Sequence, residues 1–281
     1  MRKLFLGLPL NKTVGLSQFV PAFGQLVAHD VSYTVSATGN KDQLFPIACS
    51  DGVTDMWCPL GEASNISFYR SNFTEVDGVR HPTNYQSAYL DASPIYGLTE
   101  DLALSLRTLE GGKMNLTEDG LPHYYYPDSS LTSAVGNERA QIDGGRWLIA
   151  DERNGNNLAV LCLHVVFLRE HNRRADELAG IYPDMDDNEL YQRSRQWVIA
   201  LIQSTFTSEY APAILGEALE ERVYDENADV QMDVFFSAVA FRYGHSAVSN
   251  ANRLLDSSFT PIAGDAVPIR SSLWNTRPTV S

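Results

Sequence analysis

The segment Leu158-Ala-Val-Leu-Cys-Leu-His-Val-Val-Phe-Leu168 has a single polar side chain, His164, among its eleven residues. A helix that is apolar on every side is normally buried, because no face of it suits water. The segment therefore predicts a helix at the centre of the hydrophobic core. Cys162 lies within it and is expected to be a buried thiol that packs as a small apolar side chain.

Helical patterns also occur on both sides of this segment. Apolar residues at helical spacing predict a first helix over about 16–31. Thr99 is followed by two acidic residues, which suit the positive N-terminus of a short helix. Asp186 and Glu189 have the spacing of a capping box ahead of another helix, and a last helix is expected over about 230–247.

The rest of the sequence is typical of loops. Residues 36–85 and 108–148 are rich in Gly, Asn, Asp, Ser and Pro, and the alternation of a strand is scarce. With 44% hydrophobic and 20% charged residues, the composition is that of a globular protein. We expect a mainly α fold with long loops.

Charge and hydropathy exclude several classes of partner. Lys and Arg number 21 against 35 Asp and Glu, a net charge of −14, which disfavours nucleic acid and anionic lipid as partners. No apolar run approaches the ~18 residues of a membrane span. Met1-Arg-Lys3 before apolar Leu4 to Leu10 imitates a signal peptide, but no small-residue cleavage site follows, so we expect mature sequence.

Cysteines and glycosylation sequons favour an oxidising, extracellular compartment. Cys49 and Cys58 lie nine residues apart in a loop-like stretch and are candidates for a disulfide. Acceptor sequons for N-glycosylation occur at Asn11, Asn65, Asn72 and Asn115.

Two segments carry histidines that could do chemistry. Gln25 and His29 are four residues apart, so both project from one face of the first helix. A histidine on such a helix is also common as a hydrogen-bonded core residue. In Phe241-Arg-Tyr-Gly-His245, the glycine beside the histidine could clear space for a flat ligand or serve helix packing alone.

Two further segments carry charge and oxygen ligands. The polar loop 151–157 directly precedes the apolar helix, and its Arg153 could cap, pair with a carboxylate or deliver positive charge to a cavity. Ser87, Tyr89, Asp91 and Ser93 alternate along the chain, as oxygen ligands of Ca²⁺ could, although an ordinary polar turn has the same pattern.

Taken together, these segments resemble the animal-type haem peroxidases, a family that includes myeloperoxidase, thyroid peroxidase and peroxidasin. The resemblance covers nearly the whole chain, so we expect residues 1–281 to form a single peroxidase-like domain. The matching segments come in the family's order: Phe23-Gly-Gln-Leu-Val-Ala-His-Asp30, Ser87-Ala-Tyr-Leu-Asp-Ala-Ser-Pro-Ile-Tyr-Gly97, Arg153, His164-Val-Val-Phe-Leu-Arg-Glu-His-Asn-Arg173, Trp197-Val-Ile-Ala-Leu-Ile-Gln203, Tyr210-Ala-Pro-Ala-Ile-Leu-Gly216 and Phe241-Arg-Tyr-Gly-His245.

The resemblance implies a role for each matching residue around a haem. His245 would be the proximal ligand of the haem iron, with Arg242 near a propionate. His29 would be the distal base, with Gln25 beside it and Arg153 as the distal arginine.

The resemblance also implies a calcium site and structural roles for one motif. The Ca²⁺ ligands would be Asp30, Ser87, the Tyr89 carbonyl, Asp91 and Ser93. Arg169, Glu170 and His171 are expected to pair and pack rather than react.

The chain departs from the family pattern in two respects. Ala28, Asn156 and Asn157 stand where several members form covalent links to haem, so we expect non-covalent haem b. The chain ends 36 residues after His245, and no segment resembling the family's further helical region follows. This suggests a fragment of a longer peroxidase or a reduced member.

The implied function is a secreted haem peroxidase. It would use H2O2 to oxidise small donors such as phenols, tyrosyl groups or halide-like anions, with His29 and Arg153 providing acid–base and electrostatic catalysis. A non-catalytic peroxidase-like domain for adhesion or dimerisation is the main alternative. A haem fatty-acid oxygenase, with Tyr243 near the proximal segment, is a weaker one.

Overall fold

The computed structural model describes residues 16–37, 40–48, 65–126, 144–216 and 225–277 of the 281-residue chain. Its contacts divide the chain into two compact units, one of residues 1–31 with 87–281 and one of residues 32–86. None of the helices in the described ranges combines the length and apolar character that a bilayer crossing needs.

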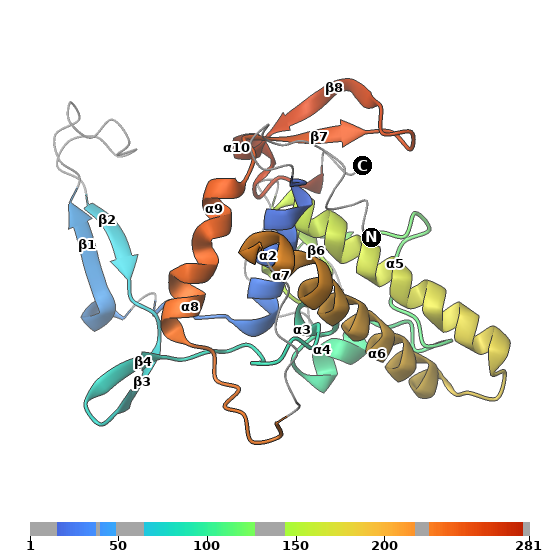
Figure 1. Ribbon diagram of the computed structural model, residues 1–281, viewed down its shortest axis with the longest axis horizontal. Helices are drawn as coiled ribbons and strands as arrows, with labels where there is room; N and C mark the ends of the chain where they lie inside the picture. Colours follow the sequence, from blue (N-terminus) through green and yellow to red (C-terminus); the bar gives the residue numbers. More distant parts are fainter. Residues whose placement is uncertain (1–15, 38–39, 49–64, 127–143, 217–224, 278–281) are drawn as a thin grey trace. The chain divides into compact units, whose positions relative to one another are not determined.

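The larger unit is built mainly from helices (Figure 1). Its helical elements are α2 (Phe19–Val31), α3 (Ser93–Tyr96), α4 (Glu100–Ser105), η3 (Glu152–Gly155), α5 (Leu158–Ile181), α6 (Asp187–Thr205), the π-helical η4 (Phe206–Tyr210), α7 (Ala211–Leu215), α8 (Val234–Ala238), η5 (Ala240–Tyr243), α9 (Gly244–Ala247) and α10 (Ile269–Ser272). Its antiparallel strand pairs are β5 (Tyr124–Tyr125) with β6 (Arg146–Trp147) and β7 (Ala251–Leu255) with β8 (Pro261–Pro268). The mainly α fold is thereby confirmed.

The smaller unit consists of η1 (Lys41–Gln43) and two hairpins, β1 (Leu44–Ala48) with β2 (Asn65–Tyr69) and β3 (Phe73–Val76) with β4 (Val79–Pro82). The sequence predicted only loop here. The turn between β3 and β4 is Asp77-Gly78, with φ of 51° and 76°, the left-handed backbone of a two-residue hairpin turn. This Asp-Gly pair was a usable hairpin signal.

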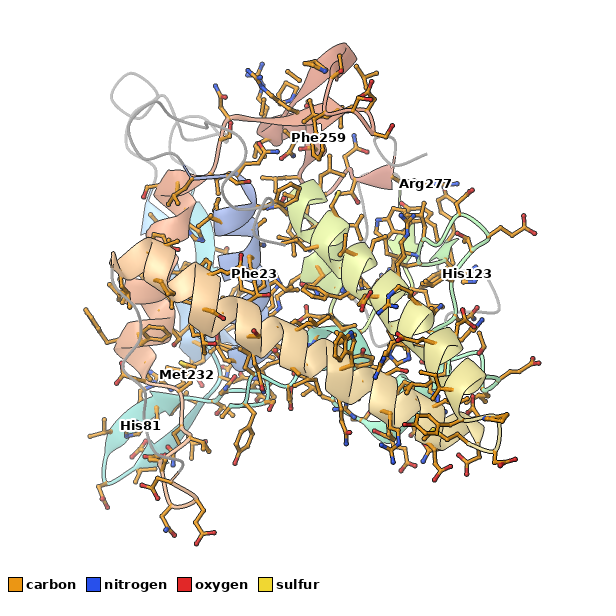
Figure 2. The ribbon with its side chains drawn as sticks, turned by 45° about the vertical axis from the view of Figure 1, so that its right-hand side comes forward. Phe23, His81, His123, Met232, Phe259 and Arg277 are labelled. Atoms are coloured by element: carbon orange, nitrogen blue, oxygen red, sulfur yellow. The ribbon has the colours of Figure 1, made fainter. Side chains whose placement is uncertain are left out.

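The core of the larger unit lies where α2, α5 and α6 meet. The two long helices α5 and α6 lie side by side (Figure 1), and α2 packs against α5. Phe23 of α2 is 1% exposed and points into the interior, whereas Phe259 in the β7–β8 turn is 74% exposed (Figure 2). Val160 of α5 and Val198 of α6 are fully buried in the same cluster.

Local signals fix several helix ends as predicted. Asp186 and Glu189 form the capping box at the start of α6, with Glu189 N–H donating to Asp186 Oδ1 over 2.8 Å. The Thr99 hydroxyl caps α4. The first helix begins at Phe19 rather than Leu16, because the hydroxyl and carbonyl of Ser17 accept the first free N–H groups.

Two predictions about helices were wrong in part. The expected helix over 230–247 is three short pieces, α8, η5 and α9, and Val239 between the first two departs from helical geometry. None of these pieces has a fully buried residue, and Phe241 and Tyr243 pack against the core only partly buried, so little packing stabilises a longer helix. The apolar helix α5 is not buried all round: Cys162 is exposed and Val166, one turn further, is 50% exposed.

Candidate functional site

Helix α2 and the α8–α9 segment line one cavity of about 130 Å³. Gln25, Ala28 and His29 come from α2, and Arg242 and His245 from the other side. The predicted distal and proximal histidines, 216 residues apart in sequence, therefore face the same space. The remaining lining residues are Pro21, Gly24, Tyr210, Ser237, Phe241, Tyr243, Gly244 and Val248.

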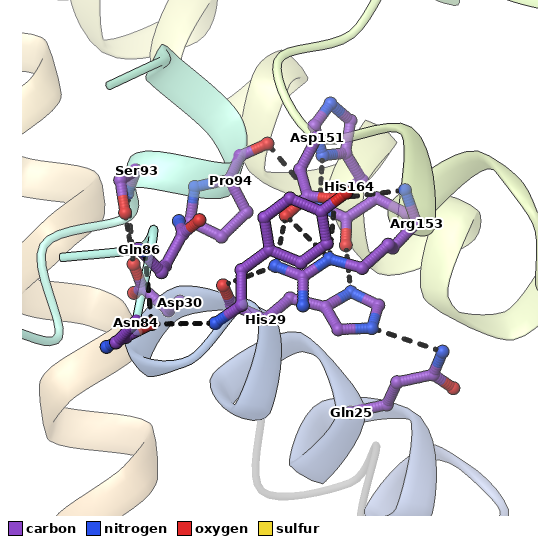
Figure 3. A network of polar contacts seen from close by, with 12 residues as sticks. Gln25, His29, Asp30, Asn84, Gln86, Ser93, Pro94, Asp151, Arg153 and His164 are labelled. Carbon is purple, nitrogen blue, oxygen red and sulfur yellow. Dashed lines mark hydrogen bonds and ion pairs between the residues drawn. The ribbon is translucent and has the colours of Figure 1, made fainter. Parts of the chain in front are cut away.

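His29 is a buried titratable group of this cavity. It is 8% exposed, its Nδ1 lies 2.7 Å from Asn154 Oδ1, and its Nε2 lies 3.4 Å from Gln25 Nε2 (Figure 3). Burial, and then the positive charge of Arg153, lower the pKa of His29 from 6.5 to about 4. The imidazole is therefore neutral near pH 7 and can accept a proton.

Arg153 is held by a carboxylate that the sequence did not identify. Its guanidinium forms a two-pronged ion pair with Asp151, whose Oδ2 lies 2.5 Å from Nη2, and Nη2 also donates to the His29 carbonyl over 2.9 Å (Figure 3). Burial alone would raise the pKa of Asp151, but the hydrogen bonds and charge of Arg153 lower it. Arg153 touches the backbone of His29 and is absent from the cavity lining.

The opposite side of the cavity is open and lightly packed. His245 is exposed and, among the described residues, its imidazole makes no hydrogen bond. Arg242 donates to the Ser237 carbonyl over 3.1 Å. A Cβ on Gly244 would meet only Pro21 Cβ, at 3.9 Å, so this glycine leaves open space rather than a tight contact.

Two tyrosines bridge the two sides of the cavity. The hydroxyls of Tyr210 and Tyr243 lie 2.5 Å apart. The Tyr210 hydroxyl also sits directly over α2, where a Cβ on Gly24 would approach it to 2.1 Å. Gly24 is thus required for this close approach of a ring to the helix backbone.

The predicted calcium residues converge through hydrogen bonds. Ser93 N–H lies 3.0 Å from both Asp30 Oδ1 and Asp91 Oδ1, so the two carboxylates share one donor (Figure 3 shows the Asp30 side). Ser93 Oγ donates to Asp30, and Ser87 Oγ donates to Asp91 over 2.9 Å. Tyr89 is 60% exposed.

Asp30 is a buried carboxyl with a raised proton affinity. The pKa of Asp30 is raised from 3.8 to about 7, mainly by burial; the charge of Asp91 also raises it, whereas the hydrogen bond from Ala92 N–H lowers it. The described residues contain no group of three His, Cys, Asp or Glu side chains placed to hold a metal. The cluster around Asp30 offers two carboxylates, from Asp30 and Asp91, together with the hydroxyls of Ser87 and Ser93.

The middle of α5 makes structural contacts. His171 is fully buried between the Tyr96 hydroxyl, 2.9 Å from Nδ1, and the Gly112 carbonyl, 2.8 Å from Nε2. Arg169 donates to backbone carbonyls of 119–120, and Glu170 pairs with a neighbouring arginine and the Trp197 indole. These contacts agree with the predicted pairing and packing.

Other predicted residues are placed as follows. Asn157 caps α5 by accepting Ala159 N–H, and Asn156 is buried beside it. Cys49, Cys58 and Asn11 lie outside the described residues. Asn72 and Asn115 are half-buried, and each has its amide in a hydrogen bond, to Tyr85 and His123 respectively.

Sequence reasoning missed Asp151 and Asn154, the immediate partners of the two predicted distal residues. Both lie in the polar loop already singled out for Arg153. Their residue types carried a signal. An aspartate two residues before an arginine can form an ion pair with it, and an asparagine directly after the arginine can hydrogen-bond to neighbouring side chains. Which side chain each one meets was not readable from spacing.

Comparisons with known proteins agree with the resemblance. The family model described as animal haem peroxidase matches residues 6–281. Peroxinectin A of Dictyostelium discoideum is 30% identical over 250 residues, 83% of this chain and 44% of that protein. Human lactoperoxidase is 31% identical over 290 residues, 90% of this chain and 40% of that protein.

Solved structures share the fold. Peroxidase A from Dictyostelium discoideum superposes with a TM-score of 0.83 at 24% identity, covering 99% of this chain and 56% of that one. A fatty acid alpha-dioxygenase from Oryza sativa superposes with a TM-score of 0.68 at 20% identity, covering 91% of this chain and 44% of that one.

The chain spans less than half the length of the two curated relatives. With the family model matched from residue 6 to residue 281, the chain belongs to the animal haem peroxidase family.

Proposed function

We propose that this chain binds haem b non-covalently between α2 and the α8–α9 segment and oxidises small electron donors with H2O2. The observation that carries the proposal is that His29 and His245 line one cavity. A buried, neutral imidazole on one side and an exposed, unbonded imidazole on the other are the two groups that haem peroxidase chemistry needs from a protein.

The residues around the cavity fit a haem. Ala28 and Gly244 line the cavity without bulky side chains, and among the described residues nothing bonds His245, so both of its nitrogens are available to a metal. The cavity volume of about 130 Å³ is below the ~300 Å³ of small ligand sites, so binding requires the walls to part. Moving that segment away from α2 would break the Tyr210–Tyr243 hydrogen bond and the partly buried contacts of Phe241 and Tyr243 with the core, so contacts with haem have to offset this cost.

His245 would coordinate the haem iron, and Arg242 would pair with a propionate. Among the described residues, the exposed guanidinium of Arg242 is held through its Nε alone, by the Ser237 carbonyl, which leaves its other nitrogens able to meet a carboxylate. Ala28, Asn156 and Asn157 have no group that forms an ester or sulfonium link. The haem would therefore be held by coordination, ion pairing and apolar contact alone.

When bound, the haem supplies the oxidising power of the reaction. The protein supplies proton handling: neutral His29 accepts a proton from H2O2 at Nε2 and returns it to the departing oxygen. Arg153 provides fixed positive charge at the same end of α2, where its Nη2 lies 2.9 Å from the His29 carbonyl. Gln25 limits the space beside the imidazole and donates a hydrogen bond into it.

A calcium ion bound by Asp30, Asp91, Ser87, Ser93 and the Tyr89 carbonyl would fix the end of α2. Two carboxylates that share one N–H donor repel each other, and a divalent cation removes that repulsion. Asp30 directly follows His29, so the ion would also hold the orientation of the distal base.

The donor class proposed is small reducing molecules such as phenols, tyrosyl groups or readily oxidised anions. An extracellular location and a single domain over residues 1–281 stay predictions, as do the disulfide and the glycans. The non-catalytic alternative predicts a protein with the same fold that takes up no haem.

Haem reconstitution tests the proposal. The 281-residue chain should give a Soret band on addition of haem, and cyanide should convert the ferric form to a low-spin spectrum. His245→Ala should lose both signals. Because His245 is exposed and unbonded, this substitution leaves the fold intact, which circular dichroism can verify.

Two further variants complete the test. His123→Ala removes a half-buried histidine outside the cavity and should keep both spectra. His29→Leu should keep haem but slow the reaction with H2O2 by about 10²–10⁴, the usual contribution of a general acid–base group. No Soret band in the unmodified chain, or an unchanged one in His245→Ala, contradicts the proposal.

A further inference from the structure

A line of five polar side chains runs from the N-terminus of α5 through His29 to the interior. The successive contacts are Asn157 to Gln25 (3.0 Å), Gln25 to His29 (3.4 Å), His29 to Asn154 (2.7 Å) and Asn154 to His164 (3.1 Å). Figure 3 labels Gln25, His29 and His164 of this line. The donors and acceptors in this line can be assigned from both ends.

From the first end, the assignment starts at the cap of α5. Ala159 N–H donates to Asn157 Oδ1 over 3.1 Å, so the other amide atom of Asn157 is the nitrogen, which donates to Gln25 Oε1. This leaves the Gln25 amide nitrogen facing His29 Nε2. An amide N–H only donates, so His29 Nε2 has to accept and carries no hydrogen.

The other end gives the same answer independently. One amide atom of Asn154 lies 3.4 Å from the Pro94 carbonyl, which only accepts, so this atom is the nitrogen. The same nitrogen donates to His164 Nδ1. The Asn154 oxygen then faces His29 Nδ1 and requires a hydrogen there.

Burial prevents the reverse arrangement. Asn154 and His164 are fully buried, so a flipped Asn154 amide would set two N–H groups against each other and two oxygens against each other without water to relieve them. The line ends at His164 Nε2, a buried N–H with no partner among the described residues. The donor without a partner, His164 Nε2–H, therefore lies at the end of the line that is farther from His29.

We infer that Asn154 is a positioning residue that holds His29 in a single tautomer, with hydrogen on Nδ1 and the lone pair on Nε2. Asn157 and Gln25 support the same tautomer from the other side. The consequence for catalysis rests on the proposed function: the nitrogen that must take the proton of H2O2 is kept without a hydrogen by a residue that touches neither peroxide nor haem.

Nitrogen-15 NMR of the six histidines in the 281-residue chain without haem tests this inference. At about pH 8, where imidazoles are neutral, two-bond couplings separate the tautomers. His29 should carry its hydrogen on Nδ1 and His164 on Nε2. Signals are assigned by comparison with His29→Gln and His164→Gln.

Two variants of Asn154 should act differently. Asn154→Leu removes the acceptor for His29 Nδ1–H. The ratio of the Nδ1–H tautomer to the Nε2–H tautomer of His29 should then fall about tenfold, the factor that corresponds to one hydrogen bond. Asn154→Asp keeps an acceptor for His29 but has no N–H for His164. His29 should therefore stay unchanged while His164 moves its hydrogen to Nδ1, which separates a positioning role from general loss of structure.

Asn172→Leu is the matched control, because Asn172 bonds only the backbone of Met114 and should leave both tautomers unchanged. Hydrogen on Nε2 of His29 in the unmodified chain, or a His164 that keeps its tautomer in Asn154→Asp, would overturn the inference. The measurement needs no haem, so failure of haem binding tests the proposed function separately. In haem-loaded protein, the rate with H2O2 should fall about tenfold in Asn154→Leu and recover in Asn154→Asp.

Discussion

Replacing Gly24 by alanine should destabilise the protein although it lies within a helix. A Cβ at this position would stand 2.1 Å from the Tyr210 hydroxyl, 3.0 Å from Cζ and 3.4 Å from Cε2. The ring cannot easily retreat, because Tyr210 is 3% exposed and packs against Phe23 and Phe206 at centroid distances of 5.4 and 5.7 Å. Its hydroxyl is also bonded to Tyr243.

The expected magnitude combines three effects. Overpacking costs about 1–3 kcal/mol, and loss of the Tyr210–Tyr243 hydrogen bond adds about 1 kcal/mol. The higher helix propensity of alanine returns about 1 kcal/mol. The free energy of unfolding should therefore fall by about 1–3 kcal/mol, as measured by urea denaturation.

A double-mutant cycle locates the cause of this loss. Tyr210→Phe removes the hydroxyl, the atom in closest conflict with a Cβ on Gly24. In that background Gly24→Ala should cost at least about 1 kcal/mol less. Gly180→Ala is the matched control: a Cβ on Gly180 meets nothing within 4 Å, so this substitution should be neutral or stabilising. Additivity of the Gly24 and Tyr210 substitutions within about 0.5 kcal/mol would refute the steric argument.

Three further outcomes are expected. Burial lowers the pKa of both His164 and His171 to about 4, so on acidification the unfolded chain takes up protons before the folded chain does. The free energy of unfolding should therefore fall between about pH 6.5 and pH 4, by up to about 3 kcal/mol per histidine. Urea denaturation at several pH values should show a weaker fall in His171→Gln. Acid–butanone should extract the haem fully, and pigment left on the polypeptide would show a covalent link. Excess EGTA or Asp91→Ala should lower the melting temperature and haem retention together, and no change in either would argue against calcium at Asp30 and Asp91.

Several elements of the fold could be predicted because their signals are local. The capping box of Asp186 and Glu189 and the Thr99 cap depend on residues three apart, and the same contacts appear in the structure. The helix predicted over 230–247 was too long because its apolar periodicity did not reveal that the segment has no fully buried residue. The exposure of Cys162 could not be predicted either, because a continuous run of apolar residues does not show which face of the helix packs against the core.

The sequence by itself determined the helical character of the chain, its family and the residue types of the site. It set Gln25 and His29 on one helix face, because helix geometry alone puts residues four apart side by side. Only the tertiary structure decided that Asp151 holds Arg153 and that Asn154 joins His29 to His164. His29 and Asn154 are 125 residues apart, and their contact depends on how α2 packs against α5. Spacing along the sequence does not predict such a contact. It forms because the helices pack together and because buried hydrogen-bond donors need acceptors.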